Sequence, residues 1–126
     1  MVGLIAGLLM AVGYTADAEK ADKVTADKRY PESYAAFKKG FVPAFERTFS
    51  KRTLKAPSEA LVDECCSESF KVLSEHLCDG QSNMTDERLG MRMALAFFLP
   101  AKVSERMNKA VEVVVSKHIK AGTVHK

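Results

Sequence analysis

Three cysteines and a histidine form the group in the sequence that most resembles a metal site. They are Cys65, Cys66, His76 and Cys78. Thiolate and imidazole are the usual ligands of structural zinc, which needs four of them around one ion. If this segment is helical, however, Cys65 and His76 lie about 16 Å apart along the helix axis. We therefore expect small buried thiols and a partly buried histidine here, and no metal or other cofactor.

The cysteines also do not suggest a disulfide framework or nucleophilic catalysis. Neighbouring Cys65 and Cys66 could close only a strained ring, and Cys66 and Cys78 would lie about 18 Å apart on one helix. A catalytic Cys–His pair would have to form between different elements, with His118 or His125 as the histidine. No Gly-rich phosphate loop, zinc-protease motif or nucleophile elbow occurs in the sequence. We expect a protein that is not an enzyme, in a reducing compartment.

The first eighteen residues are the most apolar part of the chain. Residues 2–13 are all apolar or glycine, and Gly3, Gly7 and Ala11 form a strip of small residues on one face of a helix. Such a strip lets the backbone of another helix approach closely. The uncharged stretch covers about 22 Å at the helical rise, short of the roughly 30 Å hydrocarbon core of a bilayer. We therefore expect residues 1–18 to form a projecting apolar helix that docks on other subunits or on lipid.

A second interpretation of the same segment is a secretory signal. Residues 16–18, Ala-Asp-Ala, satisfy the small-residue rule for cleavage, but no basic residue precedes the apolar run. The Asn-Met-Thr triplet at 83–85 would be glycosylated in an exported protein. The chain would then be a secreted helical binding protein that lacks residues 1–18.

Aromatic side chains recur every three or four residues from Tyr30 onward and fall within a strip about 120° wide on a helical wheel. We call the five that follow Tyr30 the aromatic strip: Tyr34, Phe37, Phe41, Phe45 and Phe49. The commonest role of such a strip is to cover the core of its own domain. Because lysines and arginines surround it, the strip also suits a bilayer headgroup boundary or a partner. Base stacking is a third interpretation, but recognised RNA-binding signatures are missing, so nucleic acid is not an expected partner.

Proline and glycine divide the rest of the chain into helices. Gly40 and Pro43 interrupt the aromatic region, which predicts two short helices at about 31–39 and 43–54 joined by a kink. The best-delimited helix runs from Pro57, in its first turn, to a C-terminal cap at Gly80.

Two further helices are predicted in the C-terminal third. Thr85 can cap the first of them, and its apolar end, MALAFFL at 93–99, should lie deep in the core. Pro100 either kinks that helix or begins the last one, which keeps its apolar period as far as a stop at Gly122.

These segments predict an all-α fold, a small bundle of three to four amphipathic helices over residues 30–122. The projecting helix 1–18, a charged connector at 19–29 and a frayed tail at 123–126 complete the chain. The net charge of +3 is unevenly distributed, with +5 over 38–55, −7 over 56–87 and +6 over 88–126. We expect the acidic segment to pack between its basic neighbours.

The leading functional hypothesis is a non-catalytic accessory subunit of a larger membrane-associated complex. Its partners would be other protein subunits, with lipid as a further contact at the N-terminal helix and the aromatic strip. An organellar membrane such as the mitochondrial inner membrane is the expected location. The alternatives are the secreted binding protein and a self-contained soluble bundle that is a small enzyme or a nucleic-acid binder.

Overall fold

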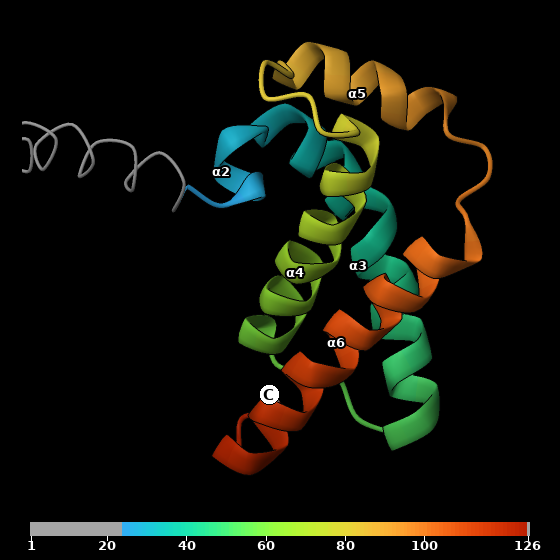
Figure 1. Cartoon of the computed structure of the whole chain (residues 1–126). Coiled ribbons are helices and arrows are strands. Elements are labelled where there is room, and N and C mark those ends of the chain that lie inside the picture. The colour runs from blue at the N-terminus through green and yellow to red at the C-terminus, as the bar shows by residue number, and fades with distance from the viewer. Residues whose placement is uncertain (1–23, 126) are drawn as a thin grey trace, which may run out of the picture.

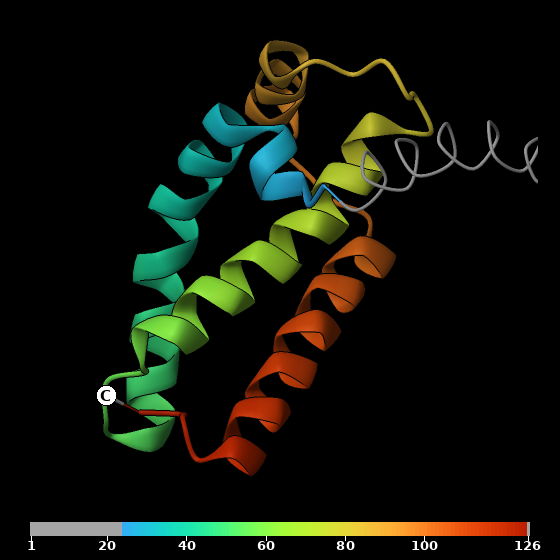
Figure 2. The same cartoon turned by 90° about the vertical axis from the view of Figure 1, so that its left-hand side faces the viewer.

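The computed structural model describes residues 24–125, which form helices connected by loops (Figure 1). The helix α4 lies in the middle, α3 and α6 lie on either side of it, and α5 crosses one end (Figure 2). Within the described residues there is no β-strand, so the predicted all-α bundle is confirmed. The helices are α2 (Ala26–Arg29), α3 (Pro31–Thr53), α4 (Glu59–Cys78), α5 (Asp86–Leu95) and α6 (Ala101–Ala121).

The core consists of two clusters of buried side chains, one toward each end of α4. Phe70 and Leu61, both fully buried, are the largest side chains that α4 contributes to them. Burying a phenylalanine or leucine stabilises the fold by about 1.5–3 kcal/mol. The face of α4 that carries these two residues therefore contributes much of the packing between α4 and the other helices. The first cluster contains Tyr30, Phe70, Met84 and Leu89, and the second contains Phe49, Leu61, Cys65 and Val114.

Ion pairs join the acidic helix α4 to the basic helices beside it. On one side Lys38 of α3 lies 3.3 Å from Asp63. On the other side Arg106 of α6 lies 3.2 Å from Glu75, and Lys117 of α6 pairs with Glu64. This arrangement agrees with the alternation of charge along the sequence, although each exposed pair contributes less than about 1 kcal/mol.

The helix α3 is continuous through Pro43, so the prediction of two short helices with a kink was wrong. Proline removes one backbone donor, which leaves the carbonyl group of Lys39 without its helical partner. Both Pro43 and Lys39 are exposed, so water can satisfy that carbonyl. Phe41 and Phe45 stack across the same turn on the inner side, with ring centroids 5.6 Å apart, and this packing favours a single helix.

Most of the apolar segment at 93–99 lies outside the core, contrary to the prediction, although Met93 packs half-buried against it. The helix α5 ends at Leu95, and the side chains of Leu95, Phe97 and Phe98 are 70%, 82% and 92% exposed. Pro100 disfavours helical geometry at the residue before it, so the chain leaves the helix and crosses to α6 as a loop. Leu89 is the one buried residue of α5, and Met93, one turn later, packs half-buried against the same core cluster.

The tail folds back onto the start of α4 and is not frayed at His125. The backbone N–H of Ser58 donates to the carbonyl oxygen of Val124 at 2.9 Å, and the Ser58 hydroxyl donates to that of Thr123 at 2.7 Å. The His125 ring lies 5.4 Å from the ring of Phe49. These contacts connect the end of α6 to the first turn of α4.

The N-terminus of α3 is capped by a side chain far away in the sequence. Its own N-cap residue, Tyr30, makes no side-chain cap. Instead the carboxylate of Asp86 in α5 accepts hydrogen bonds from the backbone N–H groups of Glu32 at 2.8 Å and Ser33 at 2.9 Å, and the Ser33 hydroxyl donates to the carbonyl oxygen of Asp86 at 2.9 Å. Burial alone would raise the pKa of Asp86, but the hydrogen bonds from Ser33 and Glu32 outweigh it and lower the pKa.

We expect Asp86→Ala to lower the free energy of unfolding by about 1–2 kcal/mol, the usual effect of losing a helix cap. The loss should appear in urea unfolding at neutral pH. Glu87→Ala is the matched control, because Glu87 lies in the same first turn, is exposed and leaves the cap intact. Equal stability of the two variants would show that Asp86 acts only through the dipole of its own helix.

Candidate functional site

The residues of the suspected metal site all lie on α4 and do not converge. Cys65 and Cys66 are buried, while His76 and Cys78 near the other end are half-buried. Among the described residues, no three histidine, cysteine or acidic side chains are arranged to hold a metal ion. The continuous helix therefore keeps the candidate ligands apart, as the sequence geometry requires.

The two buried thiols are poor nucleophiles. Burial, with a smaller contribution from neighbouring Glu64, raises the pKa of Cys65 to about 12. Burial also raises the pKa of Cys66. Because the thiolate is the reactive form, both side chains stay protonated at neutral pH and serve as small apolar core residues.

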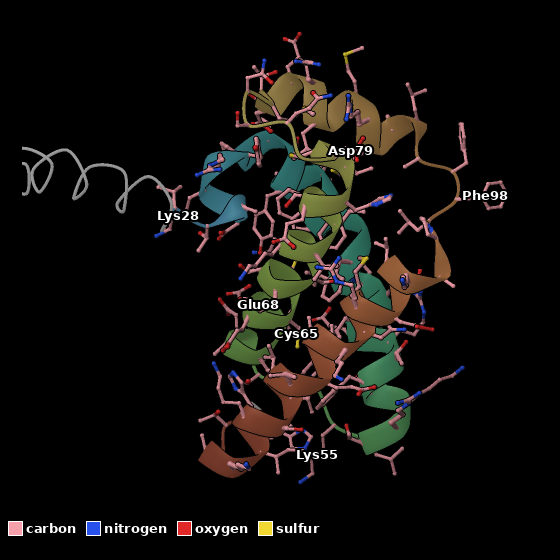
Figure 3. The ribbon with its side chains drawn as sticks, viewed as in Figure 1. Lys28, Lys55, Cys65, Glu68, Asp79 and Phe98 are labelled. Atoms are coloured by element: carbon pink, nitrogen blue, oxygen red, sulfur yellow. The ribbon has the colours of Figure 1, made fainter. Side chains whose placement is uncertain are left out.

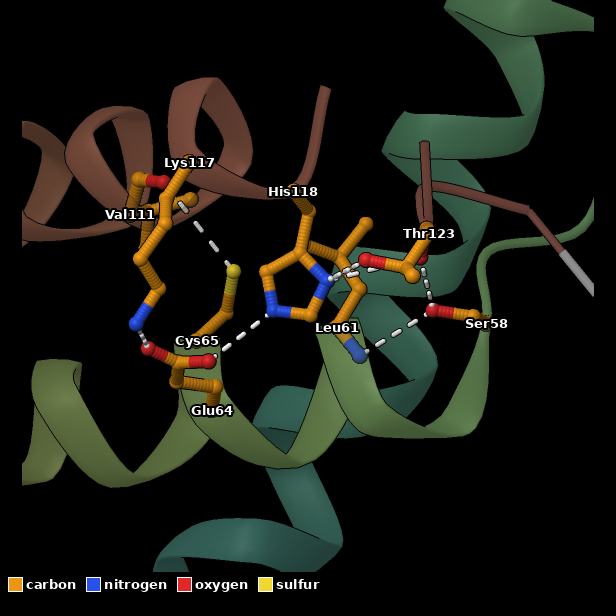
Figure 4. A network of polar contacts seen from close by, with 8 residues as sticks. All are labelled: Ser58, Leu61, Glu64, Cys65, Val111, Lys117, His118 and Thr123. Atoms are coloured by element: carbon orange, nitrogen blue, oxygen red, sulfur yellow. Dashed lines mark hydrogen bonds and ion pairs between the residues drawn. The ribbon is translucent and has the colours of Figure 1, made fainter. Parts of the chain in front are cut away.

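A polar network joins the end of α6 to α4 (Figure 4). His118 is 8% exposed, and its Nε2 lies 2.9 Å from a carboxylate oxygen of Glu64. Its Nδ1 lies 2.8 Å from the hydroxyl oxygen of Thr123. Lys117 contacts the other carboxylate oxygen of Glu64. If Nε2–H donates to Glu64, Nδ1 accepts the Thr123 hydroxyl proton, so the neutral ring is fully hydrogen-bonded.

The network has the order hydroxyl, imidazole, carboxylate that hydrolytic triads use. In this chain the same Thr123 also accepts the Ser58 hydroxyl through its carbonyl oxygen, and Ser58 in turn caps α4 by accepting the N–H of Leu61 at 3.2 Å. Through its carbonyl oxygen, Thr123 thus holds the tail against the start of α4, while its hydroxyl contacts His118. We therefore interpret Glu64, His118 and Thr123 as a clasp between helices, and we refer to them as the α4–α6 clasp.

Because of the α4–α6 clasp, we expect the free energy of unfolding to fall as the pH becomes acidic. Hydrogen bonds from Lys117 and then His118 lower the pKa of Glu64 below its usual value. A carboxyl whose pKa falls on folding contributes stability above its unfolded pKa, and that stability is lost as pH falls through the folded pKa. We expect Glu64→Gln to be about 1 kcal/mol less stable than the parent at neutral pH, and the difference to shrink below about pH 4.5.

Urea unfolding of both proteins across that pH range measures this effect. The matched control is Glu112→Gln, because Glu112 is an exposed carboxylate of α6 outside the network. If the free energies of unfolding of the parent and of Glu64→Gln instead differed by the same amount down to about pH 3, the charge of Glu64 would not be the cause of the stabilisation.

The aromatic strip packs on the inside of α3. The rings of Tyr34 and Phe37 lie 5.2 and 5.5 Å from that of Phe70 in α4, centroid to centroid. From Phe37 to Phe49, each ring contacts the next one along the strip at 5.4–5.7 Å. Phe49 is buried and the other four are half-buried. These contacts show that the aromatic strip packs against the core.

Two cavities flank α4. One of about 550 Å³ lies between α2 and α4 and includes Val24, where the described chain begins. The other, of about 440 Å³, opens beside the aromatic strip, between α3, α4 and α6. Neither is lined by a residue of the α4–α6 clasp. The second cavity is lined by Phe37, Gly40, Phe41, Ser69, Leu99, Ser104, Met107, Asn108 and Val111.

An exposed apolar surface lies on α5 and on the loop that follows it. Its members are large hydrophobic side chains with exposures of 60% or more. Met91 and Leu95 are one helical turn apart, so they share a face of α5, and Phe97 and Phe98 lie in the loop that follows the helix. We call these four residues the apolar patch.

The predicted helix-packing residues Gly3, Gly7 and Ala11 lie outside the described residues. Between residues 24 and 125 no helix combines the length and the apolar character needed to cross a bilayer. The chain matches no protein-family model, and no curated protein or solved structure shows significant similarity to it. The functional argument therefore rests on the residues themselves.

Sequence reasoning missed two of the features described above. It considered His118 only as a partner for a cysteine, and it placed Leu95, Phe97 and Phe98 of the apolar patch in the core. A histidine in the last turn of a helix, followed by Gly122 and a threonine, is a local signal for a C-terminal cap. Pro100 was the corresponding signal for a loop, because proline disfavours helical geometry at the residue before it, Leu99.

Proposed function

We propose that this chain is a non-catalytic accessory subunit of a larger membrane-associated protein complex. In this role the apolar segment 1–18 docks along helices of other subunits through its strip of Gly3, Gly7 and Ala11. The bundle itself lies at the membrane edge. An organellar membrane, such as the mitochondrial inner membrane, is the proposed location.

The observation that carries the proposal is the apolar patch. Large apolar side chains that are exposed close together on a soluble protein commonly serve an interaction. Here two neighbouring phenylalanines, Phe97 and Phe98, are 82% and 92% exposed although the chain has a core of its own. The apolar sequence of residues 1–18 is a second feature that other molecules would cover in this role.

The proposal is tested by fractionation of native membranes followed by purification under mild detergent. We expect the chain to need detergent for release and to co-purify with other subunits. Gly7→Leu should reduce that co-purification roughly tenfold, because a bulky side chain separates two closely packed helices. Ala6→Leu, which makes a similar change off the strip, should have little effect.

Two results would contradict this proposal. One is release of the intact chain by carbonate alone with no companion protein. The other is a monodisperse monomer, without detergent, that retains residues 1–18, which would indicate the self-contained soluble bundle. If Gly7→Leu co-purified as the parent does, the strip of small residues would not be the docking surface.

The secreted alternative is favoured by one observation. Asn83, the acceptor of the potential glycosylation triplet, is exposed in the loop between α4 and α5. Intact mass of the native protein separates the two functions. A mature N-terminus at Glu19 with added glycan mass would indicate export. A retained N-terminus and unmodified Asn83, expected from the three free cysteines, would indicate the accessory subunit.

A further inference from the structure

The cavity of about 440 Å³ between α3, α4 and α6, which we call the α3–α6 cavity, has an uncharged lining. None of its lining residues is acidic or basic, although 28% of the residues in the chain are charged. Phe37 and Phe41, whose rings stack with centroids 5.4 Å apart, line it from α3, and Met107 and Val111 line it from α6. Sites for small molecules commonly have this size and a mainly apolar lining with a few polar groups.

Ser69 of α4 is the buried residue of this lining, and its side chain is 2% exposed. The other buried serines are hydrogen-bonded to the chain. The Ser33 hydroxyl donates to the carbonyl oxygen of Asp86, and the Ser74 hydroxyl donates to that of Lys71 at 3.0 Å. The Ser69 hydroxyl makes no hydrogen bond within residues 24–125. Because a buried hydroxyl without a partner is unfavourable, a molecule in the cavity would stabilise it.

Gly40 leaves space in the wall of the same cavity. It lies in the middle of α3, where glycine is less favourable than alanine. A Cβ atom at this position would meet no other atom within 4 Å, so the packing of the described residues does not require a glycine. The missing side chain instead widens the cavity that Gly40 lines.

The loop before α6 reaches the α3–α6 cavity without filling it. Leu99 is one of the lining residues. Its neighbour Phe98 is 92% exposed, and in Figure 3 its side chain points away from the helices. Phe97 is 82% exposed and does not line the cavity either. The space between α3 and α6 is therefore accessible to a ligand.

We propose that the α3–α6 cavity binds an uncharged, mainly apolar small molecule that carries a carbonyl or hydroxyl group. The apolar part of the ligand would lie against the rings of Phe37 and Phe41, and its polar group would pair with the Ser69 hydroxyl. A charged ligand is disfavoured, because no lining residue of opposite charge compensates for its loss of hydration. This inference goes beyond the proposed function and does not depend on it, since the site lies within the bundle.

The Ser69 hydroxyl favours a small molecule over a docked helix. The backbone polar groups of a helix bond to one another along its interior, so its main chain would leave Ser69 unpaired. A ligand carbonyl can accept the hydroxyl proton, and a ligand hydroxyl can donate or accept.

The neutral fluorescent naphthyl ketone prodan tests the inference in the full-length chain, because its emission shifts to shorter wavelength when it leaves water. We expect saturable binding of prodan to the parent. Gly40→Leu should weaken that binding roughly tenfold or more, because the new side chain occupies the cavity. Since leucine favours a helix over glycine, this variant should fold, which urea unfolding checks.

Ala35→Leu is the matched control, because Ala35 is an exposed residue of α3 that does not line the cavity. Its prodan binding should equal that of the parent. The inference is refuted if the parent shows no saturable binding, or if Gly40→Leu binds prodan as the parent does. If Gly40→Leu instead turned a dimer into a monomer without changing prodan binding, a second copy of the chain would cover the cavity, and the ligand assignment would be wrong.

Ser69→Ala tests the polar part of the site. It should weaken prodan binding about fivefold, the usual effect of losing one hydrogen bond, and leave the stability unchanged. Ser74→Ala is the control, since Ser74 is a buried serine of the same helix outside this cavity. The analogue of prodan without its ketone should bind the parent and Ser69→Ala equally. Equal binding of prodan itself to both proteins would overturn the assignment of Ser69 and of the hydrogen-bonding ligand class.

Discussion

Phe70→Ala is expected to destabilise the protein by about 3–5 kcal/mol, the usual cost of truncating a fully buried phenylalanine. Phe70 is 0% exposed and lies in the middle of α4. Its ring contacts both Tyr34 and Phe37 of α3, so its removal leaves a cavity between the two helices. Since the whole fold of a domain is worth about 5–15 kcal/mol, this one change would remove much of the stability.

Urea unfolding followed by circular dichroism gives the measurement. Phe98→Ala is the control, because it deletes the same side chain where it is 92% exposed, and we expect a change within about 0.5 kcal/mol. If Phe70→Ala lowered the free energy of unfolding no more than that control does, the result would contradict the packing of α3 on α4 around this ring.

His118→Ala should lower the free energy of unfolding by about 2–3 kcal/mol. The substitution removes a buried ring and both of its hydrogen bonds, so the hydroxyl of Thr123 and one oxygen of Glu64 lose their partner. It should also loosen the tail. We expect faster hydrogen exchange at the N–H of Ser58, which donates to the carbonyl oxygen of Val124.

His76→Ala provides the comparison, because His76 is also a histidine in the last turn of a helix but is only half-buried. The two variants share any effect of the helix dipole, so their difference isolates the α4–α6 clasp. Unchanged exchange at Ser58 in His118→Ala would mean that the hydrogen bonds of Ser58 and the contact of His125 with Phe49 hold the tail without His118.

Much of the helical architecture could be predicted from local sequence signals. The structure bears out the cap at Thr85, whose hydroxyl accepts the N–H of Arg88 at 3.2 Å. Gly122 adopts a positive φ of 75° at the end of α6, where a stop was predicted. Such signals act over a few residues, so they are visible in the sequence without knowledge of the fold.

What the sequence did not reveal depends on tertiary contacts. Asp86 looks like an ordinary first-turn acid of α5, and only the folded chain brings its carboxylate to the start of α3. The continuity of α3 through Pro43 depends on which side of the helix meets water. The exposure of Phe97 and Phe98 depends on the core being filled by other helices, which an apolar run cannot indicate by itself.

Some of the candidate functional residues could likewise be found from the sequence, and others only from the structure. The aromatic strip was found from its period, although periodicity alone left core, lipid and nucleic acid open as roles. The apolar patch was found only from the exposures in the structure. Gly3, Gly7 and Ala11 lie outside the described residues, so their role in docking stays a prediction.

Photo-crosslinking from the apolar N-terminal segment tests the accessory-subunit function most directly. A photoreactive leucine analogue at Leu8 would be activated in native membranes, and the crosslinked products identified by mass spectrometry. We expect crosslinks to lipid or to helices of other proteins. Crosslinks confined to residues 24–125 of the same chain would contradict the proposed function, as would a mature protein that lacks Leu8.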